Sequence, residues 1–546
     1  MSRIFNRLRI IFDSSINCGN ILDKAAEFHP SSTLFHTSDA LPYKFLAETE
    51  MDLCSILKFV NRVGNLLLAN GLQQYDRVAI FKTNNIDYFF LALAVVKAGG
   101  IAVPINSGMR VENLEYYLNN VGAKFVFTDT SVFHLTGIDL NTFKGDYIWL
   151  FPDLPDCPPT QSIDINASVT SMSDQLPVRC IWPDTLILIV HTSGTTGFPK
   201  GVMCTSGGLM TAIKGHYKSE PIHRGNRIAI AGHYNHLVYY VGFLTSMLAN
   251  METWILPPDN SERIFETIGK ENINIFFGFP DVYLRMYEKG LAHYNLETVK
   301  VWVSTADASH SVHIHAFIRA GAFLRLFGKK IISAVFIDVI GTSEVGSGAL
   351  RRIVLPFTKQ SENRCVGRPF LGGPKVKIAD KTGRTLRWGI PGRLMVKGPT
   401  LFKGYWNAHE TSLGTTYDNW WWTGDWVVKD FTGCYYHLDR YGDRIKTPTG
   451  IMNSLVVEEY LLKHPKVLEA VVIGVLGKDR VQIPIAIIAP FVENTLDEQE
   501  MLDWANQNIV SDIPLQKIYI LPAREIPRGL TGKVLKRVLR EKYQNV

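Results

Sequence analysis

The chain has 546 residues, of which 46% are hydrophobic and 20% charged, and its formal net charge is +6. This length exceeds what one hydrophobic core usually serves, so at least two domains are expected. The basic residues are spread along the chain, which suits anionic small ligands such as nucleotides and argues against nucleic acid. The seven cysteines form no C-x-x-C pair. They therefore argue against a zinc site or a disulfide framework and fit a cytoplasmic protein.

The first twelve residues place Arg3, Arg7 and Arg9 among apolar side chains and contain no acid. This pattern predicts one of two structures: an amphipathic helix that makes a peripheral membrane contact, or a first helix docked on its own domain. No apolar run approaches the roughly 18 residues of a membrane span, so no transmembrane segment is expected.

Predicted helices and strands alternate in the first part of the chain. Helices are predicted over 53–72, 87–97 and 111–121, and strands over 77–81, 100–105 and 124–128. Alternation of this kind predicts an α/β fold, in which parallel sheets are flanked by helices.

Three later segments differ in composition. Residues 150–180 are rich in proline and predict a long surface connection. After residue 365, short strands with glycine turns predict a β-rich subdomain, and from about residue 439 helices return, which predicts a small α+β domain. We place the N-terminal domain at 1–439, a hinge at 440–443, and the C-terminal domain at 444–546.

A loop of small hydroxyl residues and glycines, closed by a lysine, follows the apolar run 186–190, which predicts a buried strand. The loop reads His191-Thr192-Ser193-Gly194-Thr195-Thr196-Gly197-Phe198-Pro199-Lys200-Gly201. Glycine lets backbone N–H groups approach a ligand, the hydroxyls add donors, and Lys200 adds a positive charge. The order strand, loop, lysine therefore predicts a polyphosphate site. It is not the common nucleotide loop, because Gly201 stands where that loop has Ser or Thr.

This loop resembles the phosphate loop of the acyl-adenylate-forming (AMP-binding) enzymes, a superfamily of acyl- and aryl-CoA ligases, peptide-synthetase adenylation domains and beetle luciferases. The family pattern T-S-G-[ST]-T-G-x-P-K-G matches at every position. Further family motifs follow in order, so that the resemblance covers about residues 50 to 540. It implies a large N-terminal domain with parallel sheets flanked by helices and a β-rich subdomain, followed by a small mobile α+β C-terminal domain.

The resemblance implies a nucleotide site drawn from several segments. Residues 303–308 align with the adenine and acyl-pocket loop, residues 338–344 resemble the motif [Y/I]-G-x-[T/S]-E, and residues 421–425 resemble the motif whose Asp takes both ribose hydroxyls. Glu344 and Thr196 would hold Mg²⁺. The implied ATP- and AMP-binding residues are Thr192, Ser193, Gly194, Thr195, Thr196, Gly197, Lys200, Ala306, Asp307, Asp338, Ile340, Gly341, Thr342, Ser343, Asp425 and Arg440.

The acyl pocket implied by the resemblance is small or flat. Thr305-Ala306 stands where many members have Gly-Gly, and Ile340 replaces a common aromatic residue, as in the benzoate-CoA ligase branch. An aromatic or medium-length acid is therefore expected. His236 best matches the family's acyl-site histidine and could orient a carboxylate as a cation or a hydrogen-bonding group, although His233 competes for this role. The implied pocket residues are His236, Tyr239, Thr305, Ala306, Gly341 and Gly346.

The C-terminal motif P-R-x-x-x-G-K matches residues 527–533, which makes Lys533 the implied catalytic lysine of adenylation. Lys446 is the implied lysine of the thiolation step, and His236 completes the implied catalytic set. The hinge segment departs from the family: Gly442 replaces Asp or Lys, Thr449 replaces a glycine, and Val456 replaces a glutamate. The thiol could therefore be coenzyme A or the phosphopantetheine of a carrier protein.

The resemblance implies an ATP-dependent acid–thiol ligase, an acyl-CoA synthetase in the broad sense. It would convert a small carboxylic acid into acyl-AMP with release of pyrophosphate and then transfer the acyl group to a thiol. ATP, Mg²⁺ and coenzyme A are the expected cofactors, an acyl carrier protein is a candidate partner, and the chain is expected to be a monomer or homodimer. Two alternatives stay open: a luciferase-like adenylating oxygenase and a degenerate adenylate-binding protein. The retained Lys200, Glu344, Asp425 and Lys533 argue against the second.

Overall fold

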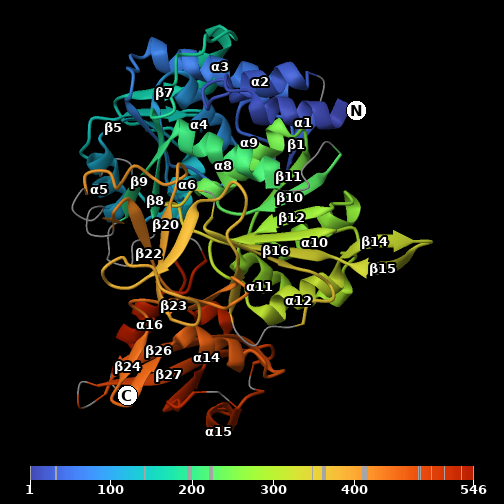
Figure 1. Ribbon diagram of the computed structural model, residues 1–546. Helices are drawn as coiled ribbons and strands as arrows, with labels where there is room; N and C mark the ends of the chain where they lie inside the picture. Colours follow the sequence, from blue (N-terminus) through green and yellow to red (C-terminus); the bar gives the residue numbers. More distant parts are fainter. Residues whose placement is uncertain are drawn as a thin grey trace.

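The computed structural model describes the chain except for residues 1, 31–32, 140–142, 193–198, 220–224, 347, 360–363, 409–415, 478, 480, 494, 509–510, 530–531 and 545–546, and the side chains of residues 2–6 and 33. Two large sheets, a β-rich subdomain and a small C-terminal domain make up the molecule (Figure 1). Among the described residues, no helix is long and apolar enough to cross a membrane.

The seven-stranded sheet contains the strands predicted near the start of the chain. Its order is β7 (Ser162–Asp164), β6 (Ile148–Phe151), β5 (Ala123–Phe127), β3 (Arg77–Ile80), β4 (Ile101–Pro104), β8 (Leu186–Thr192) and β9 (Lys200–Thr205). All neighbours are parallel except β8 and β9, which run antiparallel on either side of the predicted phosphate loop.

The eight-stranded sheet is parallel in its centre and antiparallel at both edges. Its order is β17 (Leu350–Val354), β16 (Val335–Ile340), β13 (Val301–Thr305), β12 (Ile275–Gly278), β10 (Arg227–Ala231), β11 (Glu252–Leu256), β1 (Thr33–Thr37) and β2 (Glu50–Asp52). The strand predicted from the apolar run 334–340 is β16.

Helices form three layers around the two sheets. The layer between the sheets contains α2 (Ile21–Phe28), α3 (Leu53–Ala69), α4 (Asp87–Lys97), α8 (Ser206–Ser219) and α9 (Leu237–Leu248). The outer faces are covered by α5 (Val111–Val121) and α6 (Thr130–Thr136) on one sheet, and by α10 (Ser261–Lys270), α11 (Pro280–Glu288) and α12 (Ser311–Ala320) on the other. Because α4 lies between two sheets, it is buried on all sides, which explains its continuous apolar sequence.

The β-rich subdomain and the C-terminal domain follow as predicted. The former is a sheet of β18 (Cys365–Gly367), β23 (Tyr435–Arg440), β22 (Trp420–Lys429), β20 (Gly392–Lys397) and β19 (Lys375–Ala379), with β21 (Thr416–Tyr417) beside β22. The latter contains the hairpin β24 (Ile445–Thr447) and β25 (Gly450–Met452), and the sheet β26 (Val467–Leu476), β27 (Gln482–Pro490) and β28 (Lys517–Ile520). Its helices are α14 (Ser454–Leu461), α15 (Glu498–Asn508) and α16 (Lys536–Lys542).

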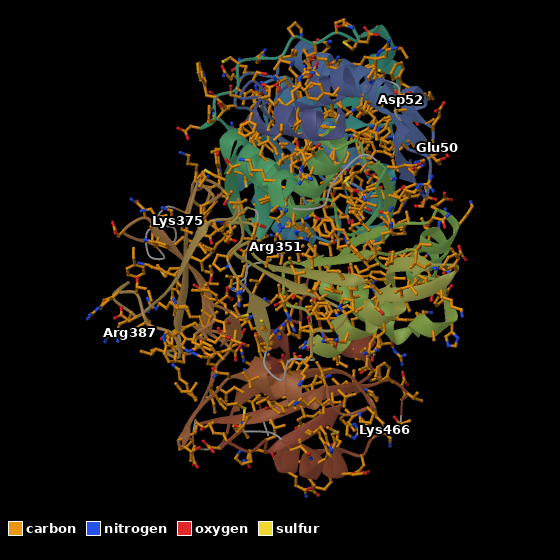
Figure 2. All side chains as sticks on the ribbon, turned by 45° about the vertical axis from the view of Figure 1, so that its right-hand side comes forward. Glu50, Asp52, Arg351, Lys375, Arg387 and Lys466 are labelled. Carbon is orange, nitrogen blue, oxygen red and sulfur yellow. The ribbon has the colours of Figure 1, made fainter. Side chains whose placement is uncertain are left out.

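The predicted fold class is thus confirmed. The predicted hinge 440–443 begins at the last residue of β23 and continues into the connection to β24, while the domain boundaries themselves stay predictions. Charged side chains such as Lys375, Arg387 and Lys466 point outward in Figure 2, as expected for the surface of a globular chain.

The interpretation of residues 150–180 as a surface connection is wrong in part. This segment contains the edge strand β7 and the short helix α7 (Ile165–Ser168). Ile165 and Val169 are buried against the central layer, and Arg62 on α3 donates to the Val169 carbonyl. Elements this short carry too few residues to show a periodicity, so the sequence pattern did not predict them.

The N-terminal helix α1 (Ser2–Phe12) docks on its own domain. Ile10 is buried, Arg7 donates to the Tyr217 carbonyl on α8, and Lys214 on α8 donates to the Asp13 carbonyl. Leu8 and Phe12 stay exposed. The structure thus contains the docked helix, and a membrane contact through residues 1–12 stays a prediction.

A buried charge cluster joins the seven-stranded sheet to its helices. The ammonium of Lys82, directly after β3, lies 3.0 Å from Asp87 Oδ1 on α4 and 3.4 Å from Asp129 Oδ2 at the start of α6. Tyr43 donates to the second oxygen of Asp87 at 2.9 Å. Lys82 and Asp87 are almost completely inaccessible to solvent, so each charge depends on its partners for compensation.

Replacing Lys82 with Met should lower the free energy of unfolding by about 3–5 kcal/mol, because two buried carboxylates would lose their cation. The measurement is the midpoint of thermal unfolding. Lys44→Met is the matched control, since Lys44 pairs with Asp153 at 3.6 Å on the exposed surface. This variant should unfold at the wild-type temperature. An unchanged midpoint for Lys82→Met would contradict a structural role for the cluster.

Candidate active site

A cavity of about 780 Å³ lies where the carboxyl ends of the parallel strands face the C-terminal domain. β13 and β16 are adjacent in register, with Thr305 beside Val339, so the loops that follow them open at one edge. The predicted site residues that line this cavity are Thr192, Lys200, His236, Thr305, Ala306, Asp307, Gly341, Thr342, Ser343, Glu344, Gly346, Arg440, Gly442 and Lys533.

The loop after β13 has a strained backbone at the cavity wall. Ala306 adopts a φ of 78°, a conformation that favours glycine. Behind this loop, Asp338 on β16 accepts hydrogen bonds from the Ser309 backbone N–H at 3.1 Å and from the Ser309 hydroxyl at 3.0 Å. Burial raises the pKa of Asp338 to about 7 against the opposing charge of Arg352 and the Ser309 hydrogen bonds. Asp338 supports the loop and does not line the cavity.

The loop after β16 carries Glu344 to the cavity. Tyr405 donates its hydroxyl to Glu344 Oε1 at 2.8 Å, and the ammonium of Lys200 lies 5.5 Å from the centre of the Tyr405 ring. Tyr405 therefore fixes the carboxylate and the lysine relative to one another. The hydroxyl of the neighbouring Thr342 is buried and has no hydrogen-bond partner among the described residues, as expected where a ligand supplies the missing partner.

Asp425 on β22 is held ionised by two residues of β23. Its Oδ1 lies 3.0 Å from Arg440 Nε and 3.3 Å from His437 Nε2. Burial raises the pKa of Asp425, but Arg440 and His437 outweigh it and hold this pKa well below its usual range. An ionised carboxylate can only accept hydrogen bonds. Asp425 does not itself line the cavity, but it lies between the lining residues Gly424 and Arg440, so its predicted contact with the ribose stays a prediction.

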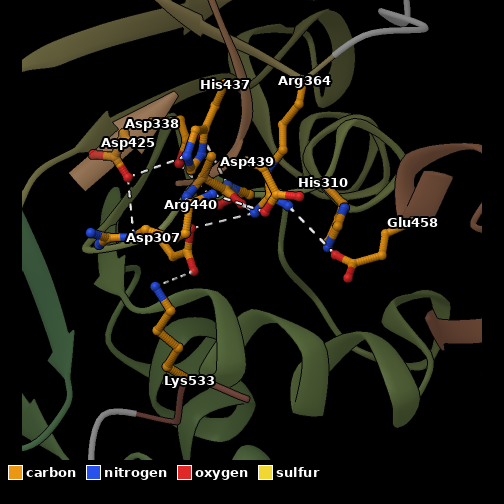
Figure 3. A network of polar contacts seen from close by, with 12 residues as sticks. Asp307, His310, Asp338, Arg364, Asp425, His437, Asp439, Arg440, Glu458 and Lys533 are labelled. Carbon is orange, nitrogen blue, oxygen red and sulfur yellow. Dashed lines mark hydrogen bonds and ion pairs between the residues drawn. The ribbon is translucent and has the colours of Figure 1, made fainter. Parts of the chain in front are cut away.

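Lys533 reaches the cavity from the C-terminal domain. Its ammonium lies 3.5 Å from Asp307 Oδ2, while Arg364 of the β-rich subdomain lies 3.4 Å from Asp307 Oδ1 (Figure 3). Burial raises the pKa of Asp307, but the charges of Lys533 and Arg364 hold this pKa well below its usual range. The charges of His437 and Arg440 lower it further. A carboxylate and a lysine from different domains thus meet at the cavity.

A second set of contacts fastens the C-terminal domain next to this pair. Glu459 on α14 lies 2.8 Å from His310 Nδ1 and accepts a hydrogen bond of 2.8 Å from the Ser311 backbone N–H, at the start of α12. Glu458 lies 4.0 Å from Arg364. A carboxylate at a helix N-terminus satisfies a free N–H and stabilises the helix dipole.

Sequence reasoning missed Arg364, His437, Tyr405 and Glu459. Each is an isolated residue outside the motifs, so its own neighbours in the sequence carry no signal. Arg364 and Tyr405 line the cavity. His437 and Glu459 do not line it, but contact Asp425 and His310, respectively.

His236 lies at the start of α9, where its Nε2 is buried and finds no hydrogen-bond partner in the part of the chain that the structure describes. Burial, and to a lesser extent His233 and His191, lower the pKa of His236 to about 3. The imidazole is therefore neutral at physiological pH. Of the two predicted ways in which it could orient a carboxylate, hydrogen bonding is the one this environment allows.

Two predicted pocket residues lie behind the wall. Tyr239 is buried, with its hydroxyl donating to the Ala231 carbonyl at 2.9 Å, because α9 turns this side chain toward the eight-stranded sheet. Ile340 packs in the core of the β-rich subdomain with Val345 and Leu350. Neither lines the cavity, so the interpretation of these two as ligand contacts is corrected to a supporting position.

The remaining predicted residues lie elsewhere. Ser193, Gly194, Thr195, Thr196 and Gly197 fall outside the described residues, so the predicted phosphate contacts and the Thr196 metal contact stay predictions. Lys446 is exposed on β24 and is not part of the cavity lining. In this structure Lys533 therefore occupies the cavity and Lys446 does not.

Comparison with known proteins places both parts of the chain. Residues 55–406 match the AMP-binding enzymes, and residues 456–533 match the C-terminal domain of AMP-binding enzymes.

Individual relatives cover nearly the whole chain. A 3-aminoavenalumate diazotase from Streptomyces sp is 26% identical over 98% of both chains. A 3-hydroxybenzoate–CoA ligase from Aromatoleum sp. (strain CIB) is 24% identical over 88% of this chain and 90% of its own. The solved anthranilate CoA ligase with bound anthranoyl-AMP superposes with a TM-score of 0.83 at 21% identity, covering 96% of this chain and 97% of its own.

The Glu459 contact gives a prediction for domain docking. Burial raises the pKa of Glu459, but the hydrogen bond and charge of His310, then Arg364 and the Ser311 N–H, lower it to about 2. Since a carboxyl in the undocked chain has a pKa of about 4.3, the contact stabilises docking fully above that pH and loses its effect as pH falls toward 2.

Glu459→Gln should therefore increase the undocked population about tenfold at pH 7, as expected for the loss of a charged hydrogen bond, and its difference from wild type should shrink below pH 4. Limited proteolysis in the connection 440–443 measures this population. Glu493→Gln, in an exposed pair with Arg524, is the control. Equal cleavage of wild type and Glu459→Gln at pH 7 would show that this contact does not fasten the domains.

Proposed function

The chain belongs to the AMP-binding enzyme family, and from this premise we propose that it activates a carboxylic acid with ATP and transfers the acyl group to a thiol. The observation that carries the proposal is the meeting of Lys533 with Asp307 at a cavity also lined by Lys200, Glu344 and Arg440. This arrangement combines cations for phosphate and carboxylate oxygens with a carboxylate for a metal ion.

In the proposed adenylation step, a carboxylate oxygen attacks the α-phosphorus of ATP, and pyrophosphate leaves. Asp425, kept ionised by Arg440 and His437, accepts hydrogen bonds from the two ribose hydroxyls. Thr342 and Ser343 donate to the α-phosphate, and Lys200 compensates the charge of the leaving pyrophosphate. One carboxylate and substrate phosphate oxygens suit Mg²⁺, and Glu344, fixed by Tyr405, fits that role. Bound there, Mg²⁺ would neutralise phosphate charge.

Lys533 is proposed to bridge the substrate carboxylate and the α-phosphate, where negative charge builds up in the transition state. Its ammonium lies 3.5 Å from Asp307 Oδ2 at the cavity, so Asp307 would position the lysine close to where the two anionic groups bind.

The proposed substrate is an aryl acid. The cavity around His236 is lined by Val238, Phe279, Pro280 and Leu284, and the ring of Phe279 lies 5.5 Å from that of His236. A flat apolar ring fits such walls. The names of two relatives, which act on 3-hydroxybenzoate and anthranilate, support this class. Coenzyme A and a carrier-protein pantetheine are both candidate thiols.

A diazotase is the second candidate. A diazotase relative spans almost the full chain, and the thiolation segment around Gly442 and Thr449 departs from the family pattern. Diazotisation joins an aryl amine to nitrous acid with loss of water. Nitrite would then replace the carboxylate as the group activated by ATP, and the aryl amine would replace the thiol.

Pyrophosphate release across a substrate matrix separates these functions. An acid–thiol ligase should release AMP and pyrophosphate with benzoate-like acids and no nitrite, more slowly with octanoate, and least with palmitate. A diazotase should release them only when nitrite is present. Formation of ADP and phosphate would contradict both proposals, and a clear preference for palmitate would contradict the aryl pocket.

The two lysines of the C-terminal domain should act in different half-reactions. Lys533→Ala should lower adenylate formation by two to three orders of magnitude, roughly the effect of removing a transition-state donor, yet still transfer supplied acyl-AMP to a thiol. Lys446→Ala should leave adenylation intact and slow thioester formation, because Lys446 lies outside the cavity in this arrangement and would enter after a rotation at Gly442. Single-turnover assays of each half-reaction measure both effects.

The exposed Lys381 gives the matched control, since Lys381→Ala should change neither step. Equal loss of both steps in both lysine variants would exclude alternation between two poses.

A further inference from the structure

A β-hairpin projects from the molecule, and no step of the proposed reaction uses it. Among the described residues, its strands β14 (Ala322–Leu326) and β15 (Lys329–Ser333) pair only with each other. The hairpin extends beyond α12 at the right of Figure 1. Its base is joined to α12 by the hydrogen bond from the Ala334 N–H to the Ile318 carbonyl, and Lys330, near the tip, reaches back to the Arg319 carbonyl at 2.7 Å.

The hairpin exposes an unusual amount of apolar surface. Phe327, at its tip, is fully exposed, and five further large apolar side chains are 39% to 55% exposed: Phe323, Leu324, Leu326, Ile331 and Ile332. Single exposed apolar residues are common, but a contiguous group of this kind usually marks a contact surface.

The backbone at the tip is strained for its residue type. Phe327 and Gly328 form the two-residue turn, with φ values of 50° and 76°. This turn favours Asn or Gly at its first position, and a bulky residue there is an outlier. Because the ring is fully exposed, no packing within the molecule offsets this strain. A contact made by the ring with another phase or molecule would offset it.

Cations stand directly behind the apolar tip on both faces of the hairpin. Arg325 is opposite Lys330, and Leu326 is opposite Lys329, so neighbouring pairs point to opposite faces. Residues 322–333 contain no acid, and like charges facing one another are destabilising. Glu297 lies 3.4 Å from Arg325 and 3.8 Å from Lys330, which leaves the hairpin with a net positive charge.

We propose that this hairpin docks tip-first on an anionic lipid surface. An apolar interface covers the Phe327 ring and its neighbours from all sides, while the cations behind them reach lipid phosphates on both faces. A second copy of the chain, packed on one face or paired along one strand edge, would leave the cations of the other face without a partner. The distribution of charge on both faces therefore favours a lipid surface over a protein.

Co-sedimentation of the full chain with lipid vesicles tests the proposal. The wild type should bind vesicles of phosphatidylcholine with one part in four of phosphatidylglycerol, bind pure phosphatidylcholine weakly, and release at high salt. Phe327→Asn should weaken partitioning about tenfold through loss of the buried ring. Asn suits the left-handed turn, so this variant should keep or raise the thermal stability of the wild type. If Phe327 served only to stabilise the fold, its replacement would not weaken vesicle binding while leaving the thermal stability unchanged or higher.

Matched controls are available in the same chain. Phe431→Asn removes another exposed phenylalanine, in the turn between β22 and β23, and should bind like wild type. Lys329→Glu with Lys330→Glu should lose the preference for anionic vesicles. The ATP-dependent activity without vesicles should be unchanged in all variants.

Three outcomes would overturn the proposal: equal binding by Phe327→Asn and wild type, no preference of the wild type for anionic vesicles, or self-association that Phe327→Asn abolishes while vesicle binding is absent. The last result would assign the hairpin to an interface between two copies.

Discussion

The candidate site depends on the compensation of two neighbouring carboxylates, Asp307 and Asp425. Both are held ionised against burial by surrounding cations. Arg440 and His437, on β23, lie beside Asp425, whereas Lys533 reaches Asp307 from the C-terminal domain. Charge compensation at Asp307 therefore depends in part on the contact between the domains.

Ion pairs of both polarities join the C-terminal domain to the rest of the chain. Its Lys533 pairs with Asp307. Its Glu459 pairs with His310, and its Glu458 with Arg364. Arg364 lies between the two domains, within 3.4 Å of Asp307 and 4.0 Å of Glu458. Paired charges of opposite sign set one relative orientation, since a rotated domain would face like charges or leave buried ones unpaired. In the proposed mechanism, the substrate's anionic groups would compete with Asp307 for Lys533.

The sequence predicted the fold and the part of the site that is made of motifs. It did not predict the residues that join the site only through contacts between segments far apart in the chain. Periodicity predicted α4 and α5 at their observed bounds, and the motifs placed Asp307, Glu344 and Lys533 at one cavity. The residues next to Arg364 and Tyr405 in the sequence form no motif, because the role of each side chain comes from a contact with a residue far away in the chain. The edge strand β7 and the hairpin β14–β15 are too short or too irregular for a period. Tyr239 and Ile340 were placed one layer too near the ligand, since neither a match to a motif nor a period gives the direction of a side chain.

At the proposed acyl end of the cavity, electrostatics would restrict the proposed substrate further than the size of the cavity does. His236 and His233 both have pKa values lowered by burial, so neither offers a stable positive charge near neutral pH. Arg285, which follows the lining residue Leu284 on α11, lies 2.9 Å from Asp281 and also donates to the Pro258 carbonyl. Among the described residues, this end of the cavity therefore has no cation left over for a second carboxylate. A dicarboxylic acid would bury an uncompensated charge there, whereas an uncharged aryl ring would not. Burial of the histidines thus favours aromatic monocarboxylic acids on grounds that are independent of pocket length.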